Sequence, residues 1–210
     1  KQLLLLATTG VKGEQVYYEQ IMSRFTPFLK WHSYSEINLL RYLIYRNARI
    51  LASEPRDNQA IKDLEKEIAE IYQRNSSFFN SSFGVQTQQE FVKSQTELFK
   101  NDARLLAFIR YNPKKYLQSI RCPIFIAYAK NDNLINYLEH QKGIECALLE
   151  NQHFNFFSIA IDDANHSFED QEGYLPLYVS VHRKDSTLDL GQAFTTLLDN
   201  MTKWLQVSTK

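Results

Sequence analysis

The sequence predicts an α/β protein built on a parallel sheet, with helices that flank the sheet and an inserted helical block. Three short, continuous apolar runs bounded by turn residues are typical of buried parallel strands, and they cover residues 3–7, 124–128 and 156–161. Segments with helical character separate these runs, and the final segment, 190–205, is amphipathic. This alternation favours crossover connections, so we expect the three strands to be adjacent and parallel, with helices on both faces of the sheet.

A long helical insertion separates the first expected strand from the second. Apolar side chains recur there at intervals of three and four residues, which places them on one face of a helix. Two such faces are formed by Ile37, Leu40, Ile44 and Ala48, and by Ala60, Leu64, Ile68 and Ile71. A further helix is suggested by Glu90, Phe91, Gln95, Leu98 and Phe99. We expect residues 14–100 to form a mainly helical cap, and residues 1–13 and 101–210 to form the α/β core. Within the cap, residues 75–84 are interpreted as a polar loop, either a mobile lid or an ordinary surface loop.

Composition and charge argue against several classes of function. Lysine and arginine total 24, and aspartate and glutamate also total 24, so the formal net charge is zero. A neutral chain has no basic excess to attract phosphate backbones or anionic lipid, and we expect no nucleic-acid partner. The two cysteines, Cys122 and Cys146, are too few for a disulfide framework and lack the spacing of a zinc site. No run of about 18 apolar residues is present, so the sequence predicts no membrane span.

The sequence starts with Lys1 rather than methionine, and an apolar strand follows almost at once. Native chain ends are usually polar and frayed, so we expect Lys1 to be a cleaved or shortened end, with part of the protein upstream. The sequence does not assign the protein to a cellular compartment, because a signal peptide could precede Lys1. A sheet of only three strands would expose the edge of its first strand, so we expect residues 1–210 alone to aggregate or self-associate.

Two ionisable residues follow strand ends in a way that suggests chemistry. Asp132 comes shortly after the second expected strand, and His166 comes shortly after the third. Ligands bind at the carboxyl ends of the strands in parallel α/β sheets, and a carboxylate that accepts from a histidine ring fixes its tautomer. Each residue also has a simpler interpretation, since Asp132 could only stabilise a turn and His166 could be a surface histidine. Asp162 and Asp163 are rival candidates for the acid.

The other candidates for functional side chains are weaker. Four further histidines, His32, His140, His153 and His182, stand alone without metal-ligand spacing, and we interpret them as surface or structural residues. Aromatic residues in the first part of the insertion could line an apolar acyl pocket, although they are more typical of a helical core. These are Tyr17, Tyr18, Phe25, Phe28 and Trp31.

Four segments resemble the α/β-hydrolase superfamily, in particular its capped serine esterases and peptidases. Residues 108–123, with a Tyr-Asn-Pro and a Cys-Pro, are similar to the stretch where those chains leave the cap. Residues 124–132 resemble the strand and turn that carry the acid, and residues 164–168 resemble the Asn-His loop that carries the base. Residues 3–14 resemble the strand and turn that lead into the cap. The chain departs from the pattern at Ala129, where the acid turn usually has glycine.

The resemblance implies a serine-hydrolase-type enzyme that acts on an ester or related acyl substrate. Asp132 would be the acid and His166 the base. No Gly-x-Ser-x-Gly motif occurs in these residues, and the family order places this motif upstream of residue 3. The serine nucleophile and the oxyanion-hole amides would therefore lie outside this chain, which alone is expected to be inactive.

The resemblance implies a small acyl substrate as partner, and neither a metal nor an organic cofactor. Two alternatives stay open, a non-catalytic α/β-hydrolase-like binding module and an unrelated α/β protein. Ester, peptide and thioester substrates are not distinguished, because the fold does not decide among them.

Overall fold

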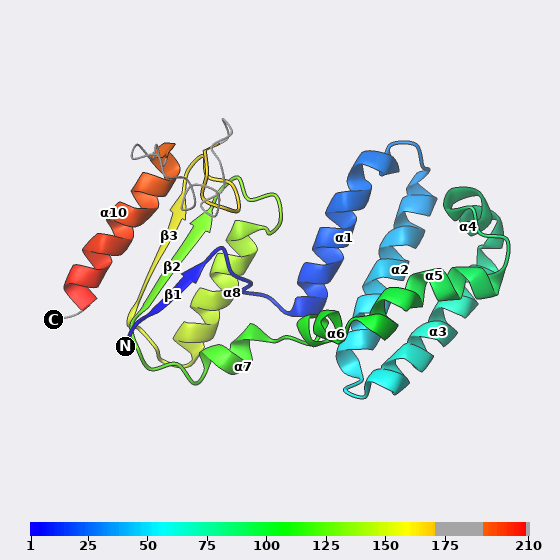
Figure 1. The fold of residues 1–210 in the computed structure, drawn as a ribbon, viewed down its shortest axis with the longest axis horizontal. Coiled ribbons are helices and arrows are strands. Elements are labelled where there is room, and N and C mark those ends of the chain that lie inside the picture. The colour runs from blue at the N-terminus through cyan, green and yellow to red at the C-terminus, as the bar shows by residue number, and fades with distance from the viewer. Residues whose placement is uncertain (171–190, 209–210) are drawn as a thin grey trace, which may run out of the picture. The chain divides into compact units, whose positions relative to one another are not determined.

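The computed structural model describes residues 1–170 and 191–208, apart from the side chains of Thr26, Phe28 and Leu29. The chain divides into two compact units (Figure 1). Lys1–Val11 and Pro113–Lys210 belong to an α/β unit, and Lys12–Asn112 form a helical unit.

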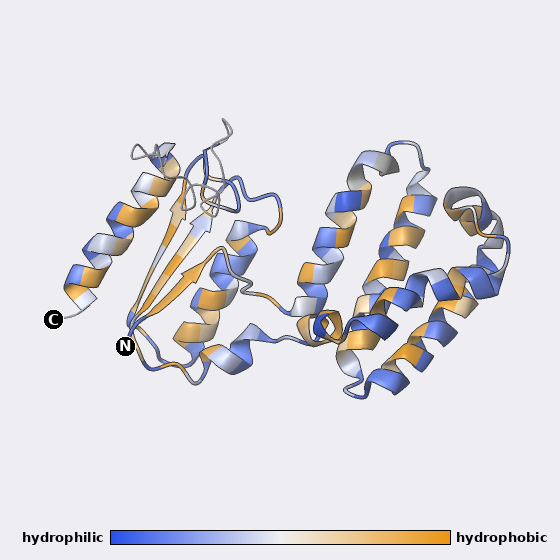
Figure 2. Cartoon of the chain, viewed as in Figure 1, coloured by the Kyte–Doolittle hydropathy of each residue, from blue (hydrophilic) through white to orange (hydrophobic). Residues whose placement is uncertain are grey.

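The α/β unit contains the three predicted strands. These strands are β1 (Leu3–Leu6), β2 (Ile124–Ala129) and β3 (Phe156–Ile161). They form one parallel sheet in the order β1-β2-β3, as expected. Every residue of the central strand β2 is buried, which is the pattern of a strand covered on both faces. Figure 2 shows β1 as apolar along its length.

Two helices cover opposite faces of this sheet (Figure 1). Helix α10 (Gly191–Ser208) packs on the face that carries Phe125, whose ring centroid lies 5.5 Å from that of Trp204. Helix α8 (Tyr137–Glu150) packs on the other face, where Gln141 Nε2 donates a 3.0 Å hydrogen bond to Ser158 Oγ. The short helix α7 (Pro113–Leu117) precedes β2 and contacts α8. The prediction of helices on both faces is therefore confirmed.

The helical unit contains a large apolar core to which several of its helices contribute. Its helices are α1 (Gly13–Leu29), α2 (Tyr34–Ser53), α3 (Asp57–Arg74), α4 (Ser76–Phe83), α5 (Gln88–Asn101) and α6 (Ala103–Ile109). The unit reaches Asn112 rather than residue 100, because α6 packs against α1, α2 and α5. Within the described ranges, no helix combines the length and apolar content needed to cross a membrane.

The expectation of a loop over residues 75–84 is wrong, because most of this segment forms helix α4. Its side chain Phe79 is fully buried, with its ring centroid 4.4 Å from that of Phe91 on α5. Tyr72 on α3 stacks on the Phe79 ring, with the two ring centroids 6.1 Å apart. Aromatic packing from two neighbouring helices thus stabilises a segment whose own sequence is polar. Helix α4 ends at Phe83 and is followed by Gly84, whose φ of 64° suits glycine.

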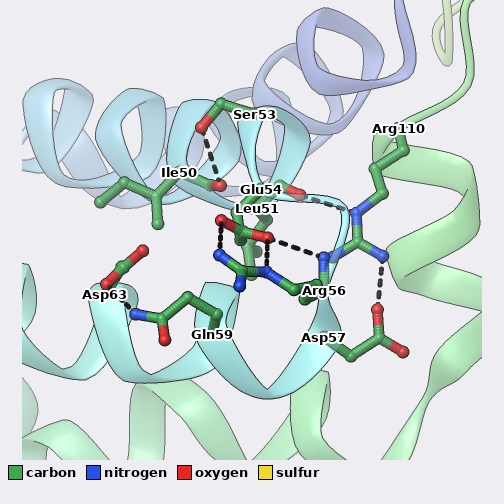
Figure 3. Close-up of polar contacts among 9 residues, drawn as sticks. All are labelled: Ile50, Leu51, Ser53, Glu54, Arg56, Asp57, Gln59, Asp63 and Arg110. Carbon is green, nitrogen blue, oxygen red and sulfur yellow. Dashed lines mark hydrogen bonds and ion pairs between the residues drawn. The ribbon is translucent and has the colours of Figure 1, made fainter.

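Arg110 ties three helices of this unit together (Figure 3). Its Nε donates to the carbonyl of Leu51 near the end of α2, at 3.0 Å. Its guanidinium also pairs with the carboxylate of Asp57, the first residue of α3. A carbonyl at a helix end and a carboxylate at a helix start both favour a cation placed between them. Arg110 therefore fixes the turn between α2 and α3.

Replacing Arg110 by alanine should lower the free energy of unfolding of the helical unit by about 1.5 kcal/mol, because a charge-assisted hydrogen bond and an ion pair are lost. Urea unfolding followed by far-UV circular dichroism would measure this loss. Arg104→Ala is the matched control, since that side chain is 97% exposed, and its effect should stay within about 0.5 kcal/mol. Equal effects of the two replacements would contradict the bridging role.

Candidate functional site

The ends of β2 and β3 continue side by side beyond the strands and bring two loops together. The backbone N–H of Lys130 donates to the carbonyl of Ile161 at 2.9 Å, and that of Asn131 donates to the carbonyl of Ala164 at 3.0 Å. These main-chain bonds extend the parallel pairing into the loops. The residue that follows Asn131 is Asp132, so its position is set by the sheet rather than by a free loop.

Asp132 and His166 meet at this end of the sheet, as the sequence predicted. Asp132 Oδ2 lies 2.7 Å from His166 Nδ1. The second oxygen, Oδ1, accepts from the backbone N–H groups of Leu134 at 2.8 Å and Ile135 at 3.0 Å. The side chain of Asp132 is fully buried, and these three bonds satisfy a buried carboxylate. Asp132 therefore stabilises its own turn and also orients the histidine, so the two interpretations of this residue are compatible.

The His166 ring is hydrogen-bonded at Nδ1, and part of its surface is exposed to solvent. Within the part of the chain that is described, Asp132 is the only hydrogen-bond partner of this ring. A carboxylate can only accept, so Nδ1 carries the proton and Nε2 of the neutral ring is left as an acceptor. The His166 side chain keeps 37% of its surface exposed, against 0% for Asp132. The pair can therefore accept a proton at Nε2 from a group that reaches this edge of the ring.

His166 projects from a tight turn anchored by its neighbours. Asn165 Oδ1 accepts from the backbone N–H groups of Ser167 at 2.9 Å and Glu169 at 3.1 Å. Phe168 is buried and has a φ of 60°. Asp170 then accepts from two backbone N–H groups at the start of α10, both at 2.8 Å. Sequence reasoning missed these supporting roles, although an asparagine beside a turn is a known signal for side-chain bonds to the backbone.

The rival acids, Asp162 and Asp163, take other positions. Asp162 Oδ1 pairs with Lys130 Nζ at 2.6 Å, and its side chain is largely exposed. This hydrogen bond raises the pKa of the Lys130 ammonium above its ordinary value. Asp163 is exposed and has a φ of 54°. The pairing with His166 therefore belongs to Asp132.

The remaining histidines and the cysteines do not gather into a second site in the described residues. His140 is buried on α8, and its Nδ1 accepts from the backbone N–H of Gly10 at 3.1 Å. His32 lies beside Phe78, with ring centroids 6.0 Å apart, and His153 is largely buried. His182 lies outside the described residues. Both Cys122 and Cys146 are free, and no group of three described His, Cys, Asp or Glu side chains could hold a metal ion.

The aromatic residues considered for an acyl pocket have separate surroundings. Tyr17 packs against the core of the helical unit, with its ring centroid 5.8 Å from that of Phe99. Burial raises the pKa of Tyr17 to about 12. Tyr18 contacts Tyr45 edge to face, whereas Trp31 is 80% exposed. The side chain of Phe28 lies outside the description. Tyr17 therefore fits the alternative of a helical core.

Comparison of the chain with protein-family models, curated proteins and solved structures finds no match in any of the three.

Proposed function

We propose that this chain supplies the acid and the base of a serine-hydrolase-type catalytic triad that acts on an ester or related acyl substrate. In this proposal the α/β unit is the C-terminal portion of an α/β-hydrolase fold, and the helical unit is its cap. The observation that supports it is the 2.7 Å contact between His166 Nδ1 and the buried Asp132 carboxylate at the carboxyl ends of two parallel strands.

The proposed chemistry uses a serine from outside residues 1–210. The serine Oγ attacks the substrate carbonyl carbon while His166 Nε2 takes the hydroxyl proton. The same proton then passes from Nε2 to the leaving oxygen, and an acyl-serine forms. Water next attacks the acyl carbon and gives a proton to His166, which passes it to the serine Oγ as the acyl–Oγ bond breaks and the carboxylic acid leaves. Asp132 stays ionised throughout and stabilises the imidazolium cation.

The contrast in burial between the two side chains supports an active pair. A buried carboxylate interacts more strongly with an imidazolium cation than an exposed one would, because the local dielectric constant is lower. The base must reach both a nucleophile and a leaving group, and the half-exposed His166 ring permits this. The alternative is a binding module that keeps the same pair for structural reasons. The two proposals differ in turnover, which is directly measurable.

Residues 1–210 alone should show no measurable turnover of p-nitrophenyl acetate or butyrate, because the proposed nucleophile and oxyanion hole are missing. A longer protein that contains an upstream Gly-x-Ser-x-Gly should hydrolyse both esters and react covalently with a fluorophosphonate probe. Esterase assays and probe labelling of the two proteins would test this expectation. A longer protein that is inert toward esters and probe would favour the binding module, and turnover by residues 1–210 alone would refute the position of the nucleophile.

A further inference from the structure

We infer that Asn165 is a positioning residue for His166 and that it acts together with Glu169. This inference deepens the proposed function and rests on it for its catalytic consequence. Among the described residues, no hydrogen bond joins the Asn165 side chain to the His166 ring. Instead, its side chain closes the turn from which His166 projects, and that turn decides whether Nδ1 reaches Asp132.

The side chain of Asn165 bonds to the turn on the far side of His166. Its Oδ1 accepts from the backbone N–H groups of Ser167 and Glu169. Its Nδ2 donates to Glu169 Oε2 at 3.0 Å. Its backbone N–H donates to the carbonyl of Glu169 at 2.9 Å, and its carbonyl accepts from the N–H of Phe168 at 2.9 Å. Five hydrogen bonds thus join Asn165 to residues 167–169, and the backbone of His166 lies within the turn that they close.

The turn needs this support because its backbone is unfavourable on its own. Phe168 adopts a φ of 60°, which residues with a large side chain rarely do. Its ring is nevertheless buried in the cluster that also contains Ala164. The hydrogen bonds of Asn165 and the burial of Phe168 together hold a conformation that the backbone alone would not favour. A different turn would move the His166 ring away from the Asp132 carboxylate.

An amide is the side chain that suits both sets of contacts. Its oxygen accepts from the two backbone N–H groups, while its nitrogen donates to the Glu169 carboxylate. An aspartate at position 165 would keep the acceptor but place a second carboxylate against Glu169, and like charges at this separation repel. Exchanging the two groups, with aspartate at 165 and glutamine at 169, would restore one donor and one acceptor. The double replacement therefore tests the pair rather than either residue.

The first experiment measures the His166–Asp132 hydrogen bond without turnover, in the longer protein that supplies the serine. Histidine-labelled protein should show a strongly downfield Nδ1 proton resonance that Asp132→Asn abolishes. We expect N165D to lose or weaken this resonance and the N165D/E169Q double variant to recover it. Asn151→Asp makes the same chemical change at the end of α8 and should leave the resonance unchanged. Retention of the full resonance in N165D, or no recovery in the double variant, would overturn the positioning role.

The second experiment measures turnover in the longer protein that supplies the serine. Misplacement of a catalytic group by about 1 Å can cost about 100-fold in rate, so N165D should lower kcat by about 10- to 100-fold with little change in KM. The double variant should recover most of this loss, and a kcat of N165D equal to that of the parent would refute the catalytic consequence. Inert parent protein combined with the expected NMR changes would refute the hydrolase and support the positioning of His166.

Discussion

His166→Ala in the longer protein that carries the serine is expected to lower kcat for p-nitrophenyl butyrate by about 1,000-fold or more, because the proton acceptor is removed. The effect should be large because Nε2 of His166 is used twice, to activate the serine and to protonate the leaving group. KM should change little, since the ring binds the substrate only through the reacting atoms. Steady-state kinetics of the purified variant would measure both parameters.

Two further variants make this result specific. Asp132→Asn should cost a similar or somewhat smaller factor, because it disturbs the tautomer and orientation of the ring while the base remains. His32→Ala is the control, since this histidine belongs to the helical unit and packs beside Phe78. Near-normal ester turnover by His166→Ala would show that the catalytic assignment is wrong. A loss of the same size in His32→Ala would point instead to a general fault in folding.

The sequence was sufficient to predict the sheet because buried parallel strands leave a local signal. The runs at 3–7 and 124–128 are apolar throughout, the run at 156–161 is interrupted only by Ser158, and each covers all or most of a strand of the sheet. The pairing of Asp132 with His166 then followed from a general property of such sheets, that the carboxyl ends of neighbouring strands lie at one edge. The second prediction depended on residues close to strand ends, where the sheet itself fixes positions.

Other features depend on contacts between segments that are distant in sequence, or on loop geometry, and sequence patterns do not show them. Helix α4 was missed because its polar residues obscure the pattern, and Phe79 becomes core only through rings on α3 and α5. The role of Asn165 was missed because it requires the backbone geometry of the turn. His140 was predicted to be structural or on the surface, but its bond to Gly10, 130 residues away, could not be foreseen.

The contact between α8 and the loop after β1 is unusually close. Gly10 donates its backbone N–H to His140 Nδ1 at 3.1 Å, and Tyr128 Oη donates to the carbonyl of Thr8 at 2.9 Å. A Cβ atom placed on Gly143 would lie 2.2 Å from the carbonyl oxygen of Gly10. Real Cβ atoms do not approach an oxygen so closely. Because the obstructing atom belongs to the backbone, it cannot rotate away as a side chain would.

Gly143→Ala is therefore expected to destabilise the α/β unit, although the same change usually stabilises a helix. Alanine gains about 1 kcal/mol over glycine in a helix interior, whereas overpacking against a fixed group costs about 3 kcal/mol. The net loss should be about 2 kcal/mol or more, measured by urea unfolding. Trp204 fluorescence in a Trp31→Phe background would follow this unit alone, since Trp204 packs on Phe125. Lys142→Ala, at an exposed position on the same helix, should change stability by less than about 0.5 kcal/mol. A Gly143→Ala protein as stable as its parent would show that α8 and the loop are further apart than the structure places them.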